Sequence, residues 1–304
     1  MTPEEVTFWG EPGVALRSDD LEVVVLPRRG AKIASLRHRS RRREWLEQPA
    51  ADLHDPPAYG SAFTDAGMFG WDEMLPTIDA SSYPDGEHRG VPLPDHGEVW
   101  TLPWETRPAG ESLVCSTSGR ALPYRVTRTM RVQDARLQLE YELSATGTAP
   151  LWLLWAAHPQ FAVDTRSTRI VLPADVHQLL NVWPNIEPER VEWPSPDLES
   201  TRGLPGGAGR KLYALPDAKI GTAGLIDADG SWLQLAWDSA LVPYLGIWLD
   251  NGAYAQHPVI ALEPATGFYD DLARAVSNQR TTQVHPERPL RWSLEVRLGS
   301  GELP

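Results

Sequence analysis

Cysteine is almost absent from this chain of 304 residues, in which Cys115 is the only one. A single cysteine excludes an internal disulfide and a cluster of thiolate metal ligands, and we expect it to be a small buried side chain. The chain also lacks the run of about 18 apolar residues that a membrane span requires. Its first 26 residues carry several acids and no long apolar stretch, so no signal peptide is indicated. These absences predict a soluble, cytoplasmic protein.

Positive charge is scarce as well. The 28 lysines and arginines face 41 aspartates and glutamates, which gives a formal net charge of −13. Such a surface repels nucleic acid and anionic membranes, so neither is an expected partner. A local basic site can override the overall sign, so a phosphorylated small molecule stays open as a ligand. The 13 tryptophans suit core packing or the apolar faces of sugar rings, and on the surface they leave a homodimer open.

Helical periodicity is rare, and only residues 270–280 offer a short helix-like stretch. Apolar and polar residues alternate without a break over 137–143 and over 291–298, and with one exception at Arg128 over 124–132. Residues 151–155 form a continuous apolar run, which is typical of a central strand. With 28 prolines and 24 glycines in frequent turn clusters, the pattern predicts an all-β fold. We expect one large antiparallel β-sandwich domain over residues 1–304, with few short helices.

Two long irregular segments, 48–90 and 178–209, interrupt the strand pattern. Long loops in a compact domain often carry function, because the scaffold positions them over a site. The first segment contains Trp71, Asp72 and Glu73, and both segments are candidates for functional loops, with plain surface loops as the alternative for the second.

Two residues next to apolar runs are candidates for acid and base chemistry. His158 follows the run 151–155, where a side chain can project into a cleft while its backbone is well held. Glu263 ends the run 259–262, and burial there would raise its pKa and tune it as a general base. A capped structural histidine and a buried glutamate satisfied by backbone donors are the alternatives. No spacing rule places the two residues together.

Three short phrases, in order along the chain, resemble the galactose mutarotase (aldose 1-epimerase) superfamily. They are His96-Gly97 with Trp104 eight residues after the histidine, His158-Pro159 with Phe161, and Glu263-Pro264 with Thr266-Gly267. Residues 25–27 and 30–33 resemble the opening strand and glycine turn of that family. Together the resemblance spans most of the chain, from about residue 21 to residue 298.

The resemblance implies a β-supersandwich with a sugar cleft on one face and activity as an aldose 1-epimerase (mutarotase) on a free or phosphorylated aldose. It implies that His158 protonates the ring oxygen, that Glu263 takes the proton of the C1 hydroxyl, and that His96 hydrogen-bonds the sugar. Ring opening, rotation and closure on the other face then invert the anomer, without a metal or cofactor. In some relatives a loop like the one around Trp71 also contacts the sugar, so the resemblance implies that Trp71, Asp72 and Glu73 bind the substrate.

The chain departs from the family pattern at several positions. Trp100 stands where an arginine is common, and Ala156 and Ala157 precede His158 where a polar residue is common. An aspartate that many members use on the sugar hydroxyls cannot be placed by motif, although Asp250 is a candidate.

Three other functions stay open. A β-sandwich glycoside hydrolase or lyase could pair Asp72 or Glu73 with Glu263, since hydrolysis needs two carboxylates. A carbohydrate-binding protein could keep the fold without turnover. A metal-dependent jelly roll could use His96 and Glu98, which would share a face if they lay on a strand.

Overall fold

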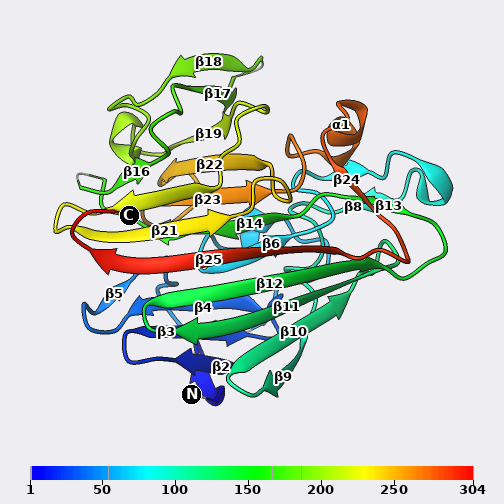
Figure 1. Ribbon diagram of the computed structural model, residues 1–304, viewed down its shortest axis with the longest axis horizontal. Helices are drawn as coiled ribbons and strands as arrows, with labels where there is room; N and C mark the ends of the chain where they lie inside the picture. Colours follow the sequence, from blue (N-terminus) through cyan, green and yellow to red (C-terminus); the bar gives the residue numbers. More distant parts are fainter. Residues whose placement is uncertain (1, 54, 166, 186, 304) are drawn as a thin grey trace.

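The computed structural model describes residues 2–53, 55–165, 167–185 and 187–303, and two large sheets dominate it. The larger sheet contains, in spatial order, β1 (Glu4–Phe8), β2 (Glu11–Arg17), β3 (Leu21–Leu26), β4 (Lys32–His38), β6 (Trp71–Met74), β14 (Ala156–Pro159), β23 (Val259–Ala265), β22 (Tyr244–Asn251), β19 (Ala208–Ala214), β17 (Gln178–Trp183) and β18 (Glu189–Glu192), with β5 (Arg43–Glu44) beside β4 and β15 (Phe161–Ala162) beside β23. The second sheet contains β16 (Arg169–Val171), β20 (Thr222–Ile226), β21 (Ser231–Trp237), β25 (Leu290–Ser300), β12 (Arg136–Ala145), β11 (Tyr124–Gln133), β10 (Ser112–Ser118) and β9 (Glu105–Ala109). In Figure 1 the second sheet lies over the larger one, with β25 in front of β6 and β14 and with β12 and β11 in front of β4 and β3.

The remaining elements are short. Two further pairs of strands are β7 (Ser81–Ser82) with β8 (Pro92–Leu93) and β13 (Leu151–Leu153) with β24 (Thr282–Val284). The helical elements are α1 (Leu272–Ser277) and the 3-10 turns η1 (Phe63–Ala66), η2 (Gly86–His88) and η3 (Thr201–Gly203). No helix in the described part of the chain is long and apolar enough to cross a membrane.

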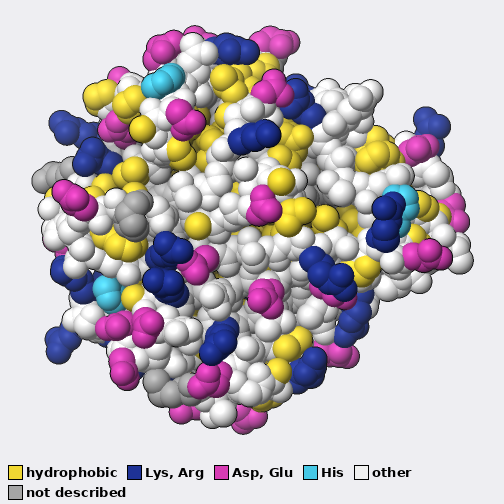
Figure 2. Space-filling view, viewed as in Figure 1, with side chains coloured by type: hydrophobic (Ala, Val, Ile, Leu, Met, Phe, Trp, Pro, Cys, Tyr) yellow, Lys and Arg dark blue, Asp and Glu magenta, His cyan; other side chains and the backbone are white. Residues whose placement is uncertain are grey.

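The all-β sandwich predicted from alternation is confirmed. In β12 the residues alternate between exposed or half-buried and buried along the strand, and β25 does the same beside it. Side chains of a strand point alternately to the two faces of a sheet, so one face of each strand enters the core and the other meets solvent. On the outer side, lysine and arginine side chains are interspersed with acidic ones (Figure 2).

Arg128, the exception to alternation in β11, lies inside the sandwich. Its guanidinium donates to Glu73 Oε1 at 2.6 Å and also to the carbonyl oxygen of Ala31. Glu73 accepts two further bonds, from Tyr141 Oη at 2.9 Å and Trp155 Nε1 at 2.7 Å. Arg128 thus keeps the alternation of β11, with its side chain facing inward. Its charge can be buried because it pairs with the buried Glu73 carboxylate.

Three local predictions need correction. The segment 48–90 is not all loop, since it contains β6, a central strand of the larger sheet. The apolar run 151–155 is not one central strand: β13 ends at Leu153 and pairs with β24, and β14 starts at Ala156. The second irregular segment contains β17 and β18. Flanking glycines and prolines hid these strands of three to six residues, because periodicity is weak in so short a run.

The predicted helix at 270–280 is present in shortened form as α1. Asp271 caps it, because its side chain accepts a hydrogen bond from the backbone N–H of Arg274 at 2.7 Å. This cap places Asp270 and Asp271 at the edge of the site described next.

Candidate functional site

His158 and Glu263 lie side by side on the two central strands β14 and β23. In the register of β14 with β6, Ala157 pairs with Glu73 and His158 pairs with Asp72. Glu73 faces the second sheet, so His158 projects from the opposite, outer face of the larger sheet. Glu263 projects from the same face, with Gly246 opposite it in β22.

A cavity of about 370 Å³ opens on this outer face. Its floor comes from the strands, and its walls come from η1, from the loops near residues 78 and 95, and from the segment that enters α1. The charged and ionisable residues around it are Asp79, Asp95, His96, His158, Lys211, Glu263, Asp270, Asp271 and Arg274. The aromatic residues around it are Phe63, Trp183, Trp248, Tyr254 and Tyr269. The structure thus brings together His96, His158 and Glu263, the three residues that the resemblance placed in one cleft.

The His158 and Glu263 side chains have free polar atoms at the cavity. His158 Nδ1 is 3.3 Å from Glu263 Oε1, but neither atom has a hydrogen-bond partner of good geometry. Both side chains are almost fully buried. Buried polar atoms without partners are costly and rare, so a donor and an acceptor left free at a cavity indicate a site for a polar ligand.

Lys211 of β19 supplies the counter-charge of Glu263. Its ammonium bonds Glu263 Oε2 and lies 3.5 Å from Asp270 Oδ1. Burial alone would raise the pKa of Glu263, but the Lys211 ammonium, together with the His158 imidazole beside it, outweighs burial and lowers that pKa to about 2. Glu263 is therefore ionised at neutral pH.

Gly246 makes the contact between Lys211 and Glu263 possible across the intervening strand β22. A Cβ at this position would lie 3.2 Å from Lys211 Cε and 3.4 Å from Glu263 Oε2. A glycine here leaves the space that the lysine side chain crosses. Lys211 could not be identified from the sequence, because neither its strand nor its charge marks it as part of a site.

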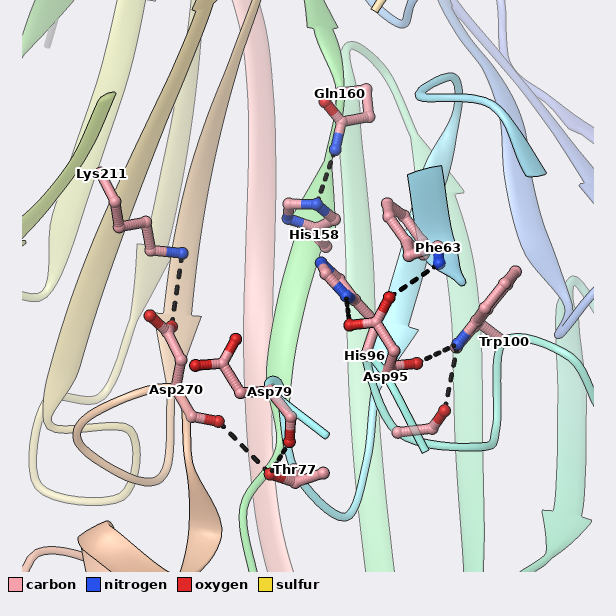
Figure 3. Close-up of polar contacts among 11 residues, drawn as sticks. Phe63, Thr77, Asp79, Asp95, His96, Trp100, His158, Gln160, Lys211 and Asp270 are labelled. Atoms are coloured by element: carbon pink, nitrogen blue, oxygen red, sulfur yellow. Dashed lines mark hydrogen bonds and ion pairs between the residues drawn. The ribbon is translucent and has the colours of Figure 1, made fainter. Parts of the chain in front are cut away.

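His158 is neutral at neutral pH. Burial lowers its pKa, and the opposing attraction of Glu263 does not restore the pKa to its ordinary value. Its other ring nitrogen, Nε2, lies 2.7 Å from Gln160 Nε2 (Figure 3). If the Gln160 amide donates in this contact, the proton of the neutral imidazole lies on Nδ1, which faces Glu263.

His96 is held by a tight turn and by ring stacking. Its Nδ1 lies 2.8 Å from Asp95 Oδ1, and its ring stacks on Phe63 with a centroid distance of 4.1 Å and an interplanar angle of 7° (Figure 3). Its ring centroid is 5.3 Å from that of His158. The next residue, Gly97, has φ +71° and lies against the backbone of Leu75, where a Cβ would come within 2.2 Å of the carbonyl oxygen. Only glycine fits this turn.

Trp100, which replaces the arginine expected from the resemblance, stabilises this turn through hydrogen bonds to its backbone. Its Nε1 donates to the carbonyl oxygens of Asp95 and Gly97, both at 3.1 Å (Figure 3). Its ring also meets Phe63 edge-on, at a centroid distance of 5.1 Å. Trp100 is buried and positions His96 rather than lining the cavity.

Asp79 and Asp270 are two carboxylates at the cavity that no motif in the sequence marks. Asp79 is accessible from the cavity, but the surrounding protein and the Asp270 charge raise its pKa to about 6. Asp270 accepts a hydrogen bond from Tyr213 Oη at 2.5 Å. The Thr77 hydroxyl connects the backbones of these two aspartates. It donates to the carbonyl oxygen of Asp79 at 2.9 Å and to that of Asp270 at 3.3 Å (Figure 3). The cavity thus holds two carboxyl groups, Asp79 and Glu263, with pKa values shifted in opposite directions.

The structure does not bring Trp71, Asp72 or Glu73 to the cavity, in contrast to the prediction. All three are in β6 and fully buried. Asp72 forms an ion pair with Lys32, and Glu73 is the partner of Arg128 in the core. Residues 71–73 were expected in a loop. They belong to a central strand, so their side chains alternate between two packed faces of the sheet.

Glu98 and Asp250 also have structural partners. Residues 95–98 form a turn rather than a strand, and Glu98 accepts bonds from Tyr59, Tyr124 and the backbone of Ala121. It therefore does not join His96 as a second metal ligand. Within the described ranges, no group of three or more histidine, cysteine, aspartate or glutamate side chains is arranged to hold a metal ion. The Asp250 carboxylate accepts from three backbone N–H groups of residues 253–255, at 2.7 to 3.3 Å.

Comparison with solved structures identifies the fold. No family model matches the chain, and no curated protein matches it. A candidate aldose 1-epimerase from Escherichia coli K12 superimposes with a TM-score of 0.71 at 16% identity, over 94% of this chain and 98% of that one. A galactose mutarotase-like protein from Clostridium acetobutylicum has a TM-score of 0.72 at 12% identity, over 98% of both chains. A galactose mutarotase related enzyme from Lactobacillus acidophilus has a TM-score of 0.71 at 12% identity, over 95% of this chain and 97% of that one.

The chain therefore has the galactose mutarotase-like fold along nearly its whole length. This confirms the predicted resemblance at the level of the fold. At 12% to 16% identity the likeness does not carry an activity with it, so the function has to be argued from the site.

Proposed function

We propose that the protein is an aldose 1-epimerase that interconverts the α and β anomers of a free sugar. The observation that carries the proposal is the pairing of His158 and Glu263, whose free polar atoms are 3.3 Å apart at the floor of a cavity. Sugar binding is supported by the size of the cavity, its aromatic walls and its carboxylates, which can accept hydrogen bonds from hydroxyl groups.

The two residues have complementary protonation states for ring opening. Glu263 is ionised and can accept the proton of the C1 hydroxyl. In its protonated form, whose acidity the lowered pKa increases, His158 can donate a ring proton to the ring oxygen as the C1–O bond breaks, which leaves the neutral imidazole. Return of both protons after rotation about the C1–C2 bond closes the ring on the other face. Each step moves a proton between the sugar and this pair, so the cycle ends with the side chains in their starting states.

The other residues of the cavity support this pair. Lys211 keeps Glu263 ionised, although the low pKa also weakens the carboxylate as a base. His96 is held over the cavity by Asp95 and Phe63 and can bond a sugar hydroxyl with its free ring nitrogen. We assign Asp79 a substrate-binding role, since its carboxylate is accessible from the cavity.

Glycoside hydrolysis is the second candidate, and one observation favours it. Glycosidases use two carboxyl groups with separated pKa values, and here the pKa of Asp79 is about 6 while that of Glu263 is about 2. Asp79 would serve as the acid in place of the buried Asp72 or Glu73 that the sequence suggested.

Polarimetry on a panel of free aldoses, together with an assay of phenol release from aryl glycosides, separates these functions. The proposal predicts that the protein accelerates mutarotation of at least one aldose and releases no phenol from the glycosides. Phenol release would instead establish hydrolysis. Sugar binding without either reaction would establish a carbohydrate-binding protein that lacks turnover, and would refute the epimerase.

A further inference from the structure

Three aromatic side chains meet at the outer end of the cavity, on the side away from His158. Trp183 ends β17, Trp248 lies in β22, and Tyr254 lies in the loop between β22 and β23. The Trp183 ring centroid is 5.3 Å from that of Trp248, and the Tyr254 centroid is 5.9 Å from that of Trp248. We call these three residues the aromatic platform.

The aromatic platform is exposed to an unusual degree. Trp183 is 39% exposed and Tyr254 is 46% exposed, and of the large apolar residues in the described ranges only Leu241 is comparably accessible. Clustered apolar surface next to a cavity commonly marks a binding site, whereas isolated exposed residues need no explanation. Flat aromatic faces bordered by polar groups suit a sugar ring, which presents C–H groups on its faces and hydroxyls at its edge.

The backbone around the platform is built to hold it. Gly209 lies under the two indoles, and a Cβ there would come within 2.7 Å of Trp248 Cη2 and 3.3 Å of Trp183 Cζ3. The fully buried Asp250 fixes the loop that carries Tyr254 through its three bonds to backbone N–H groups. The aromatic platform is therefore preformed, which lowers the entropic cost of binding.

Trp183 is the platform residue farthest from the catalytic pair, since Trp248 lies on β22, directly beside the strand of Glu263. In the sheet, Trp183 pairs with Lys211, Lys211 pairs with Trp248, and β22 pairs with the strand of Glu263. At about 4.8 Å per strand, the backbones of β17 and β23 are about 14 Å apart. A ligand that contacts Trp183 as well as the catalytic pair needs a second ring, because a single sugar ring is shorter than this spacing.

The charges of the cavity argue against a phosphate group. Five carboxyl groups (Asp79, Asp95, Glu263, Asp270 and Asp271) line it together with two permanent cations, Lys211 and Arg274. Lys211 is already paired with Glu263 and Asp270, and the Arg274 guanidinium lies 4.1 Å from the centroid of the Tyr269 ring. Arg274 is the one of these two cations without a carboxylate partner among the described residues, but the five carboxyl groups outnumber both cations, so a phosphate would meet a net negative field.

We propose that the ligand of this cavity is an uncharged reducing disaccharide. Its reducing ring lies between His158 and Glu263, and its second ring lies on the aromatic platform. The assignment rests on the proposed function for the orientation of the reducing end, but the second binding subsite stands on the platform itself.

Ligand-observed NMR titrations measure the affinity of the cavity for glucose, cellobiose, maltose and glucose 6-phosphate. We expect one of the two disaccharides to bind about tenfold more tightly than glucose, and glucose 6-phosphate to bind more weakly than glucose. Trp183→Ala and Tyr254→Ala should each reduce the preference for the disaccharide about 3- to 10-fold. Gly209→Ala should reduce it in the same direction by displacing the indoles. Leu241→Ala is the matched control, because Leu241 is 40% exposed but lies outside the cavity, and it should change neither affinity.

Equal affinity for glucose and both disaccharides, or a preference that Trp183→Ala and Tyr254→Ala leave intact, would overturn the proposed subsite. Tight binding of glucose 6-phosphate would overturn the exclusion of phosphate. Because these titrations need no turnover, they are independent of the epimerase assay. Mutarotation without a preference for a disaccharide refutes the subsite alone, and a preference without mutarotation refutes the epimerase alone.

Discussion

Replacing Lys211 with methionine tests the electrostatics of the site most sharply. The substitution keeps an unbranched apolar stem as far as Cε and removes the ammonium that contacts Glu263 and Asp270. Glu263 would then be a buried carboxylate with only His158 beside it. Without the lysine, the effect of burial dominates, and we expect the pKa of Glu263 to rise above its ordinary value of 4.5.

The size of the effect follows from the folded-state pKa. A drop from 4.5 to about 2 corresponds to about 3 kcal/mol of stabilisation of the ionised form. Because the pKa is lowered on folding, this contribution is complete above pH 4.5 and is lost as the pH falls towards 2. In Lys211→Met the sign reverses, since a carboxylate with a raised pKa destabilises the fold at neutral pH and recovers stability when it is protonated. Removing one partner of a buried ion pair costs about 3–5 kcal/mol at pH 7.

Urea denaturation at pH 7 and at pH 5 provides the measurement. The free energy of unfolding of Lys211→Met should fall below that of the wild type at pH 7, and the difference should shrink at pH 5. Lys219→Met is the control, because Lys219 is exposed and should cost less than about 0.5 kcal/mol at either pH. Equal costs for the two variants, or a difference that does not change with pH, would show that Lys211 does not hold the charge of Glu263.

Three further substitutions test separate parts of the account. Arg128→Met leaves Glu73 buried without its cation and should lower the free energy of unfolding by about 3–5 kcal/mol, as measured by urea denaturation; a loss below 1 kcal/mol would contradict the assigned core ion pair. Asp250→Ala removes the acceptor of three backbone N–H groups and should cost about 1–3 kcal/mol while weakening binding of the disaccharide in NMR titrations; unchanged binding would separate this loop from the platform. Asp79 has a pKa of about 6, so KM for the sugar should fall as the pH rises from about 5 to about 7 and the carboxylate ionises. Asp79→Asn should abolish this pH dependence of KM, and an unchanged profile would remove Asp79 from the binding site.

The regular strands could be predicted from the sequence because each encodes its own periodicity. Residues 137–143 alternate perfectly, and the structure continues the same strand from Arg136 to Ala145. The β6 strand could not be found in this way, since four residues between glycine- and proline-rich segments carry too little pattern. Trp71, Asp72 and Glu73 were consequently expected at the ligand and lie in the interior.

The candidate site could be predicted only where a local phrase marked it. His96, His158 and Glu263 each stand in a short motif, and the fold brings them to one cavity. Lys211 lies 52 residues from Glu263 and reaches it over Gly246, an arrangement that depends on strand order and on a missing side chain. The aromatic platform has the same origin, because Trp183, Trp248 and Tyr254 meet through the pairing of β17, β19 and β22. Contacts of this kind depend on the tertiary fold and leave no periodic trace in the sequence.

Saturation-transfer NMR between the anomeric protons of a free aldose tests the central claim most directly. The wild type should accelerate exchange between the two anomers, and His158→Ala and Glu263→Gln should each reduce the exchange rate by about 10²-fold or more. His257→Ala serves as the control, because His257 bonds Glu47 outside the cavity and should leave the rate unchanged. Full exchange in both the His158 and Glu263 variants, or none in the wild type for any aldose, would contradict the assignment of this pair as the acid and base of an epimerase.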